Sequence, residues 1–369
     1  MHHTASLPAD HFDELLRRLP ADLDLDALAL RTKAIERQRK IAEGADLLRL
    51  ALARGPGGLS LSETAAWASM IGLAEMSDPA IKFRLDKAVE FLAEVVSAQL
   101  AELSAGASVR WPGRVLRAAD GSSISQRASS GTDWRVHAVF DLGRGGFSHL
   151  EVTDKHGAEA LDRGAPLPGE VRIGDRNFAG AKGLQRFREQ SDGQADFIAR
   201  LRWNGLRLCK PDGKPFDLIK HLATLPNDTQ PHEVSVQAVV ARFQPLLPLR
   251  LIIRRKPPEA AEAAEAAGKT LRRSASRKQK TLDPRSLIAA EFIILATSLP
   301  VEGYPAEEVL AAYRLRWQIE LAFKRLKSLL HIDRLPTRTP QASRSWLYAH
   351  LILALLCDDL SQEFLEASP

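Results

Sequence analysis

The sequence predicts an α/β protein in which a helical N-terminal third is followed by a mixed β-sheet with further helices. Residues 8–103 carry apolar side chains at three- and four-residue steps, which is the period of amphipathic helices. From about residue 106, short apolar segments that end in Gly or Asp alternate with helical segments, a pattern typical of strands and helices in one sheet. The chain has 369 residues, enough for two or three units with at least one substantial core.

The composition excludes several classes of protein. With 45% hydrophobic and 26% charged residues, the chain has the balance of a globular protein, and its net charge of +5 is a mild indication of a polyanionic partner. Cys209 and Cys357 have no zinc-type spacing, which favours a reduced, cytosolic protein. The N-terminus lacks the order of a signal peptide, and the longest apolar run, 347–357, is too short to span a bilayer.

Two helix starts are predicted in the N-terminal third. Ser60 and Glu63 form a capping-box pattern, and Asp78-Pro79 places Pro at the first position of a helix. One face of this second helix is apolar and should pack inward; it consists of Ile81, Leu85, Val89, Leu92 and Val96. Two helices joined by a short turn could be a DNA-reading helix-turn-helix or part of a helical bundle that only packs, and both interpretations stay open.

The middle of the chain has a distinctive order of elements. Strands are predicted at 113–125, 133–142 and 147–154, a short helix at 155–163, a strand at 169–180 and a helix at 181–190. Asp120 lies on the first strand and Asp175 at the end of the fourth. This order, with an Asp at each of these positions, is the layout of a ribonuclease-H-like core.

The remainder of the chain is predicted to hold an insertion and the rest of the core. Strands are expected at 196–203, 232–243, 247–256 and 287–300, a helix of about 25 residues from Pro305, and a final helix at 340–366. The charged segment 257–286 carries six Lys or Arg between Lys269 and Lys280, and is either a solvated linker or helix or a contact to nucleic acid. The expected units are a helical DNA-binding region at 1–105, a catalytic core at 106–195 and 287–369, and a β-rich insertion at 196–286.

The stretch YRLRWQIELAFKRLK, residues 313–327, combines one carboxylate with several cations. In a continuous helix, Tyr313, Arg316, Glu320 and Lys327 lie within an arc of roughly 60°, with Lys324 beside them. Surface ion pairs such as Arg316–Glu320 would account for the charges. A Tyr and a Trp, Trp317, on the same face are less expected of a face that is only solvated.

The spacing Tyr-x2-Arg-x3-Glu-x6-Lys resembles the signature of bacterial insertion-sequence transposases of the DDE class, the group with the YREK motif. These proteins also carry one Asp in a DGT-like motif and another in a DRG-like motif, and Asp120 and Asp175 stand at the matching positions. Ser122 replaces the usual Thr and Asn177 replaces the usual Gly. The helical N-terminal third and the helix after the Glu are also similar, so the resemblance covers most of the chain.

The resemblance implies a catalytic triad of Asp120, Asp175 and Glu320 that holds two Mg²⁺ (or Mn²⁺) ions. Transfer of a phosphodiester needs an activated oxygen nucleophile and a stabilised leaving oxygen, and two divalent ions held by carboxylates supply both. A transposase of this kind cuts the ends of its element and joins them to target DNA. No HExxH, GxSxG or GxxxxGK motif offers another chemistry.

The expected partners are double-stranded DNA, as element ends and as target, and a second copy of the chain in a synaptic homodimer at the bacterial nucleoid. Cations on the Glu320 helix, together with Tyr313, should position DNA through its phosphates. The full set of expected DNA-binding residues is Tyr313, Arg316, Lys324, Lys327, Arg176, Trp203, Arg254 and Arg255. Two alternatives remain: a non-catalytic DNA-binding protein derived from a transposase, and a structure-specific nuclease without strand transfer.

Overall fold

The computed structural model describes residues 12–37, 39–105, 110–111, 113–126, 129, 131–241, 246–257, 283–330, 334–337 and 339–367. The N-terminal helices are α1 (Phe12–Leu16), α2 (Leu25–Arg31), α3 (Gly44–Arg54), α4 (Leu61–Met70), α5 (Asp78–Lys87) and α6 (Val89–Ala105). The later helices are α7 (Ala181–Gln190), α8 (Leu218–Thr224), α10 (Arg285–Ala290), α11 (Ala306–Arg314), α12 (Trp317–Leu330) and α13 (Pro340–Ala367). The strands are β1 (Arg110–Trp111), β2 (Arg114–Gln126), β3 (Trp134–Asp141), β4 (Gly146–Asp154), β5 (Glu170–Gly174), β6 (Asp196–Arg200), β7 (Leu208–Cys209), β8 (Pro231–Ala238), β9 (Leu247–Arg255), β10 (Phe292–Thr297) and β11 (Arg334–Leu335).

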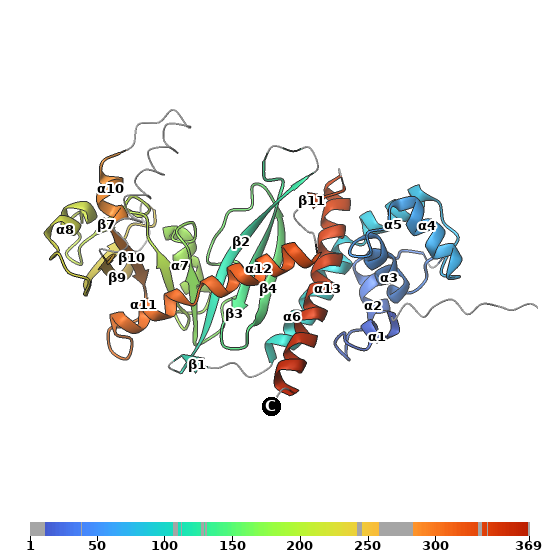
Figure 1. The fold of residues 1–369 in the computed structure, drawn as a ribbon, viewed down its shortest axis with the longest axis horizontal. Coiled ribbons are helices and arrows are strands. Elements are labelled where there is room, and N and C mark those ends of the chain that lie inside the picture. The colour runs from blue at the N-terminus through green and yellow to red at the C-terminus, as the bar shows by residue number, and fades with distance from the viewer. Residues whose placement is uncertain are drawn as a thin grey trace, which may run out of the picture.

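One mixed sheet runs through the centre of the molecule in the order β4-β3-β2-β5-β6-β10-β9-β8-β7 (Figure 1). β2, β3 and β4 form an antiparallel meander, while β5 and β6 pair in parallel with β2 and with each other. The helix α7 connects β5 to β6. This succession of strands and the first crossover helix confirm the predicted ribonuclease-H-like core.

The strands of the β-rich insertion extend this sheet. β10 pairs antiparallel with β6 on one side and with β9 on the other, and β8 and β7 continue the order. The antiparallel steps at β10 make β9 parallel to β6, so β5, β6 and β9 end at the same edge. The division of the chain into units at 195–196 and 286–287 stays a prediction, because α7 and the insertion strands share one hydrophobic cluster.

Helices cover both faces of the sheet. α11 packs on β5, β6, β9 and β10 through Val309, Leu310 and Ala312. α12, α6 and α13 pack on the meander β2–β4, and α12 crosses the sheet in contact with β2 (Figure 1). On the other face, α7 and α8 enclose the second hydrophobic cluster. The result is a three-layer arrangement in which α11 and α12 lie over the strands that carry the two Asp residues.

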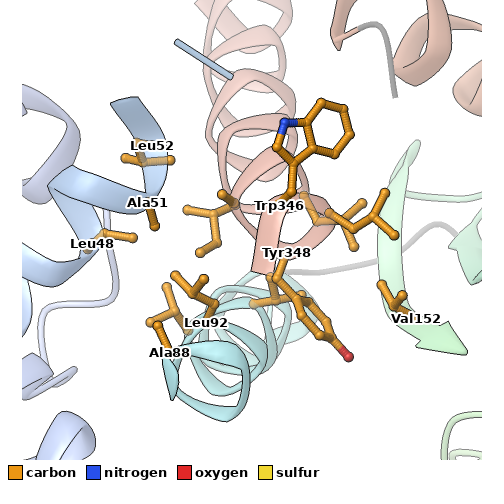
Figure 2. Close-up of a cluster of buried hydrophobic side chains, with 14 of the residues drawn as sticks. Leu48, Ala51, Leu52, Ala88, Leu92, Val152, Trp346 and Tyr348 are labelled. Atoms are coloured by element: carbon orange, nitrogen blue, oxygen red, sulfur yellow. The ribbon is translucent and has the colours of Figure 1, made fainter. Parts of the chain in front are cut away.

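The N-terminal helices are fixed to the sheet through α13. Figure 2 shows this cluster, in which α13 lies between α3, the α5–α6 junction and β4. Its labelled members are Leu48, Ala51, Leu52, Ala88, Leu92, Val152, Trp346 and Tyr348. All eight are buried. The predicted helix-turn-helix reading of this region, and its binding to DNA, stay predictions.

The predicted N-terminal helix signals are confirmed with one difference. Ser60 and Glu63 form a capping box, with the Glu63 amide 3.2 Å from the Ser60 hydroxyl, and Asp78-Pro79 opens α5. The five apolar residues of the following stretch are buried. The single helix expected there is broken at Ala88, because α5 packs against α4 and α13 while α6 packs against α13 and β4.

The short helix predicted at 155–163 is wrong, because a side chain takes the place of helical hydrogen bonds. This segment is a series of turns. The buried guanidinium of Arg172 donates to the carbonyl oxygens of Leu161, Arg163 and Gly164 at 2.8–2.9 Å. These carbonyls are therefore satisfied without a helix, and the loop is held against β5.

Two further predictions on the C-terminal side are corrected. The strand expected at 287–300 is half helix: α10 has no buried residue, and only Phe292–Thr297 forms a strand. The long helix expected from Pro305 is two helices, α11 and α12, separated at Leu315–Arg316. The two helices pack on different hydrophobic clusters, α11 on the one over β5 and β6 and α12 on the one over β2.

The basic part of the segment 257–286, including Lys269–Lys280, lies outside the described residues. Over the part of the chain that is described, no helix is both long and apolar enough to cross a membrane.

Candidate active site

Asp120 and Asp175 are neighbours because of strand register. β2 and β5 are parallel, and their last paired positions are Ala119 and Gly174. Asp120 and Asp175 follow directly, so the two carboxylates leave the same edge of the paired region on adjacent strands. Beyond this point β5 has ended, and β2 gains a new neighbour only at Ser125, which pairs with β11.

Both carboxylates point to the α11–α12 side of the sheet. Residues two apart on a strand share a face. Val171 and Ile173 pack in the cluster beneath α11, which places Asp175 on that face. Ala118 belongs to the cluster beneath α12, which places Asp120 there as well.

Asp120 is held in an environment that opposes its ionisation. Burial raises the pKa of the Asp120 carboxyl to about 6, and the carboxylates of Glu159 and Glu320 add to the increase. The Gly121 amide, 2.9 Å from Asp120 Oδ1, and the Arg316 guanidinium act in the opposite direction. A divalent cation near Asp120 would remove this cost, since it favours the charged carboxylate.

Glu320 lies in the first turn of α12, close enough to Asp120 to affect its pKa. Its Oε1 accepts a hydrogen bond from Arg316 Nη2 at 2.6 Å, so the expected ion pair is present. Burial lowers the pKa of the Arg316 guanidinium, but the bond to Glu320 and nearby negative charge raise it above its usual value. The Glu320 side chain is 54% exposed, which leaves it able to turn away from Arg316.

Tyr313 connects α11 to the second Asp. Its hydroxyl lies 3.4 Å from Asp175 Oδ1, and the Arg316 guanidinium lies 5.9 Å from its ring centre. Burial and the charge of Asp175 raise the pKa of the Tyr313 hydroxyl, so it stays protonated and donates. Tyr313, Arg316 and Glu320 thus meet the two Asp residues despite the break between α11 and α12.

The oxygen atoms of Asp120, Asp175 and Glu320 are suitable ligands for divalent metal ions, although they do not converge on a single point. Within the described ranges, no three Asp, Glu, His or Cys side chains are grouped so that they could ligate an ion as they stand. Glu320 is turned to Arg316 instead. Hard carboxylate oxygens from three elements are nevertheless the ligands that Mg²⁺ prefers, and burial, which raises the pKa of Asp120, adds a cost of ionisation that a bound cation would offset.

A fourth carboxylate, Glu159, was not foreseen from the sequence. It comes from the loop that Arg172 holds, and its Oε2 accepts a hydrogen bond from Asn177 Nδ2 at 2.6 Å. Asn177 in turn accepts a bond from Arg202. A Cβ at Gly121 would lie 2.9 Å from Glu159 Oε1, so this glycine permits the close approach of the loop to β2. The departure from the usual Gly at 177 is the signal that could have pointed to this contact.

The other predicted DNA-binding residues fall into two groups. Arg176 and Lys324 are exposed near the carboxylates, and Lys327 lies on α12 with its side chain outside the described residues. The remaining three side chains have partners within the protein. The Trp203 indole donates to Ser286 at 3.2 Å, Arg254 pairs with Glu307, and Arg255 pairs with Glu291. Their contact to DNA stays a prediction.

Comparison with known proteins agrees with the geometry. Residues 111–356 match the family described as the transposase DDE domain, a span that includes both Asp residues and Glu320. The chain belongs to the DDE transposase family. Transposases of this family use divalent metal ions for DNA cleavage and strand transfer.

Full-length relatives of this DDE transposase come from Escherichia coli. InsL of strain K12, assigned as the transposase of insertion sequence element IS186A, is 37% identical over 363 residues, 98% of this chain and 96% of InsL. The transposase of insertion sequence element IS421 is 37% identical over 364 residues, with the same coverage. The transposase of element IS231F from Bacillus thuringiensis subsp. israelensis is 29% identical over 242 residues, 60% of this chain and 49% of the relative.

A solved structure that aligns with this DDE transposase is the piggyBac transposase synaptic complex with hairpin DNA. The alignment covers 95% of this chain and 76% of the other, with 10% identity and a TM-score of 0.43. A likeness at this level carries no conclusion about the fold or the site.

Proposed function

We propose that this DDE transposase cuts the ends of an insertion sequence and joins them to target DNA with Asp120, Asp175 and Glu320 as its catalytic carboxylates. The observation that carries the proposal is the register of β2 and β5, which brings two Asp residues together directly beneath the helix that presents Glu320. It works at the nucleoid as a homodimer on double-stranded DNA.

The three carboxylates would hold Mg²⁺ (or Mn²⁺). When bound, such ions activate an oxygen nucleophile and stabilise the leaving oxygen. The Tyr313 hydroxyl orients the Asp175 carboxylate, and the Gly121 amide orients that of Asp120. Arg316 holds Glu320 in the metal-free protein, and it would be free to contact a DNA phosphate where Glu320 ligates an ion.

The remaining parts have supporting roles. Lys324 and Lys327 on α12, with Arg176 after β5, position the phosphate backbone. The helical region 1–105 binds the element end. The insertion 196–286 supports the DNA beside Asp175, where the sheet continues beyond β5. Each of these assignments rests on charge and position along the chain.

The direct test is Glu320→Gln in the full chain, which keeps the size and helix propensity of the side chain and removes its charge. The substrate is a labelled duplex with one terminal repeat, read from the DNA that flanks the gene. We expect cleavage in Mg²⁺ to fall by at least about 10³-fold, comparable to loss of a single catalytic electrostatic group, while duplex binding is retained.

The matched control is Glu308→Gln on α11, an exposed carboxylate in the helix just before the site. It should cut like the parent protein. If Glu320→Gln cuts at the parental rate, the assignment of α12 to the active site is wrong. A parent protein that binds the duplex but never cuts it would be a non-catalytic derivative, and one that cuts without joining would be a nuclease.

A further inference from the structure

Three strands of the sheet bring basic residues to one edge beside Asp175. β5, β6 and β9 run in the same direction, and their carboxyl ends lie at the edge where Asp175 stands. Arg176 follows Asp175, Arg200 is the last residue of β6, and Lys256 follows the last residue of β9. Parallel strands that end together place such residues near one another.

Arg200 is the central member of this group. The β5–β6 ladder ends at Gly174 and Ala199, so Arg200 stands next to Asp175 in the same way that Asp175 stands next to Asp120. Ile198, two residues earlier, packs beneath α11. Arg200 therefore points to the face on which Tyr313 and Asp175 lie.

The charge of Arg200 reaches both of the other cations. Burial lowers the pKa of Arg176, and the positive charge of Arg200 lowers it further. Burial also lowers the pKa of Lys256, and Arg200 and then Arg176 add to the effect. Arg200 is thus close enough to act on both Arg176 and Lys256, in agreement with the strand register that places the three residues together.

This repulsion is not relieved by carboxylate partners. Among the described residues, the side chains of Arg176 and Arg200 make no hydrogen bond or ion pair, although Arg176 lies close enough to Asp175 to sense its charge. Lys256 donates one bond, to the carbonyl of Ala290, and its ammonium has three protons. The neighbouring arginines on β9 are different, since Arg254 pairs with Glu307 and Arg255 with Glu291.

Arg200 and Lys256 lie on the other side of the two Asp residues from the cations at and before the start of α12. Arg316 and Lys324 lie on the α12 side of the two Asp residues, over β2. Arg200 and Lys256 lie on the opposite side, toward the insertion strands. A DNA strand that passes over the carboxylates therefore has positive charge on both sides of the phosphate that reacts.

We infer that Arg176, Arg200 and Lys256 form a phosphate-binding site that holds the DNA strand on the β6–β9 side of the catalytic carboxylates. Only Arg176 of these was anticipated, and Arg200 and Lys256 both come from the predicted insertion at 196–286. The inference rests on the proposed function, and it adds the path of the strand: from α12, across Asp120 and Asp175, to the end of β9. These are positioning residues, because they contact phosphates next to the reacting one.

The test is the double variant Arg200→Gln/Lys256→Gln in the full chain, with binding measured by fluorescence anisotropy. The probe is a fluorescein-labelled duplex that carries one terminal repeat, titrated in Ca²⁺ between 50 and 200 mM NaCl. Each lost phosphate contact lowers the slope of log Kd against log salt by about 0.9, so we expect a decrease of nearly two units and a Kd at least about tenfold higher.

A matched control removes the same charge elsewhere on the insertion. Lys210→Gln/Lys214→Gln changes two exposed lysines near β7 and should keep the parental slope. Arg200→Lys keeps the charge and should keep most of the slope. Binding by the double variant within twofold of the parent, or an equal loss in the control, would overturn the inference.

A second measurement is decided by the parent protein, so its outcome does not depend on the folding of the variant. Methylphosphonate replaces single phosphates, one at a time, within three nucleotides on each side of the cleavage site. We expect replacement on one side to weaken binding by the parent but not by Arg200→Gln/Lys256→Gln. If no replacement near the cleavage site affects the parent, the phosphate site is absent. Metal-dependent cutting by the parent, abolished in Glu320→Gln, would then still support the proposed function.

Discussion

Replacing Asp120 by Asn should stabilise the folded protein while it removes activity. The carboxyl group is largely buried near two other carboxylates, and its pKa is raised from 3.8 to about 6, with burial as the main cause. Asn keeps the shape of the side chain and an oxygen for the Gly121 amide. It removes the negative charge, which burial and the neighbouring carboxylates disfavour when no cation is bound.

The magnitude follows from the difference in pKa. A group whose pKa is higher in the folded state favours folding when it is protonated, and this contribution is lost as the pH rises through about 6. One pKa unit corresponds to about 1.4 kcal/mol, so the ionised carboxylate costs about 3 kcal/mol at pH 7.5 and about 1 kcal/mol at pH 4.5. Asp120→Asn should raise the free energy of unfolding by these amounts.

The measurement is urea unfolding of both proteins in EDTA at the two pH values. Addition of Mg²⁺ should then raise the stability of the parent at pH 7.5 and leave that of Asp120→Asn nearly unchanged. Asp133→Asn is the control, because the pKa of Asp133 is lowered by the bond from the Gln126 amide, and this change should not stabilise. Equal stabilities of parent and Asp120→Asn at pH 7.5 would refute the electrostatic account of the site.

Three other outcomes are expected. Cleavage of end DNA should require Mg²⁺ or Mn²⁺ and stop in EDTA, whereas full activity in chelator would exclude the metal-dependent mechanism. Arg172→Met leaves Glu170, which is 0% exposed, with the more distant Arg117 at 3.6 Å, so it should lower the free energy of unfolding by about 3 kcal/mol. Arg31→Met, which breaks an exposed pair with Glu94, should cost under about 1 kcal/mol, and similar losses for the two variants would contradict this reasoning. Burial lowers the pKa of His350 to about 4, so its contribution to stability is full above pH 6.5 and is lost as the pH falls toward 4. From pH 7 to 5 the parent should lose about 2 kcal/mol more than His350→Phe in denaturant unfolding, and parallel losses would show that this histidine does not titrate as described.

The sequence predicted those features that depend on local pattern. Short apolar segments that end in Gly or Asp were sufficient to place β2 to β5 and the two aspartates. The capping-box pattern at Ser60 was sufficient to place α4. The spacing from Tyr313 to Glu320 anticipated their common location, even though the helix between them is broken.

The features that were missed depend on contacts between distant segments. No Gly or Pro marks the break at Leu315–Arg316, which arises because α11 and α12 pack on separate clusters. The loop at 155–163 has helix-forming residues, but a buried arginine from β5 binds its carbonyls. Glu159 enters the site on that loop, so its position could not be read from a pattern of neighbouring residues.

The pairing of β10 with β6 has a consequence for how this architecture varies. After β6 ends at Arg200, the chain runs through β7, β8 and β9 and returns beside β6 as β10, with Leu295 opposite Arg200. The entrance and exit of the insertion are thus adjacent, so residues can be gained or lost between them without displacing α11, α12 or Glu320. The length of this segment can therefore change in evolution while the arrangement of the sheet beneath α11 and α12 stays the same.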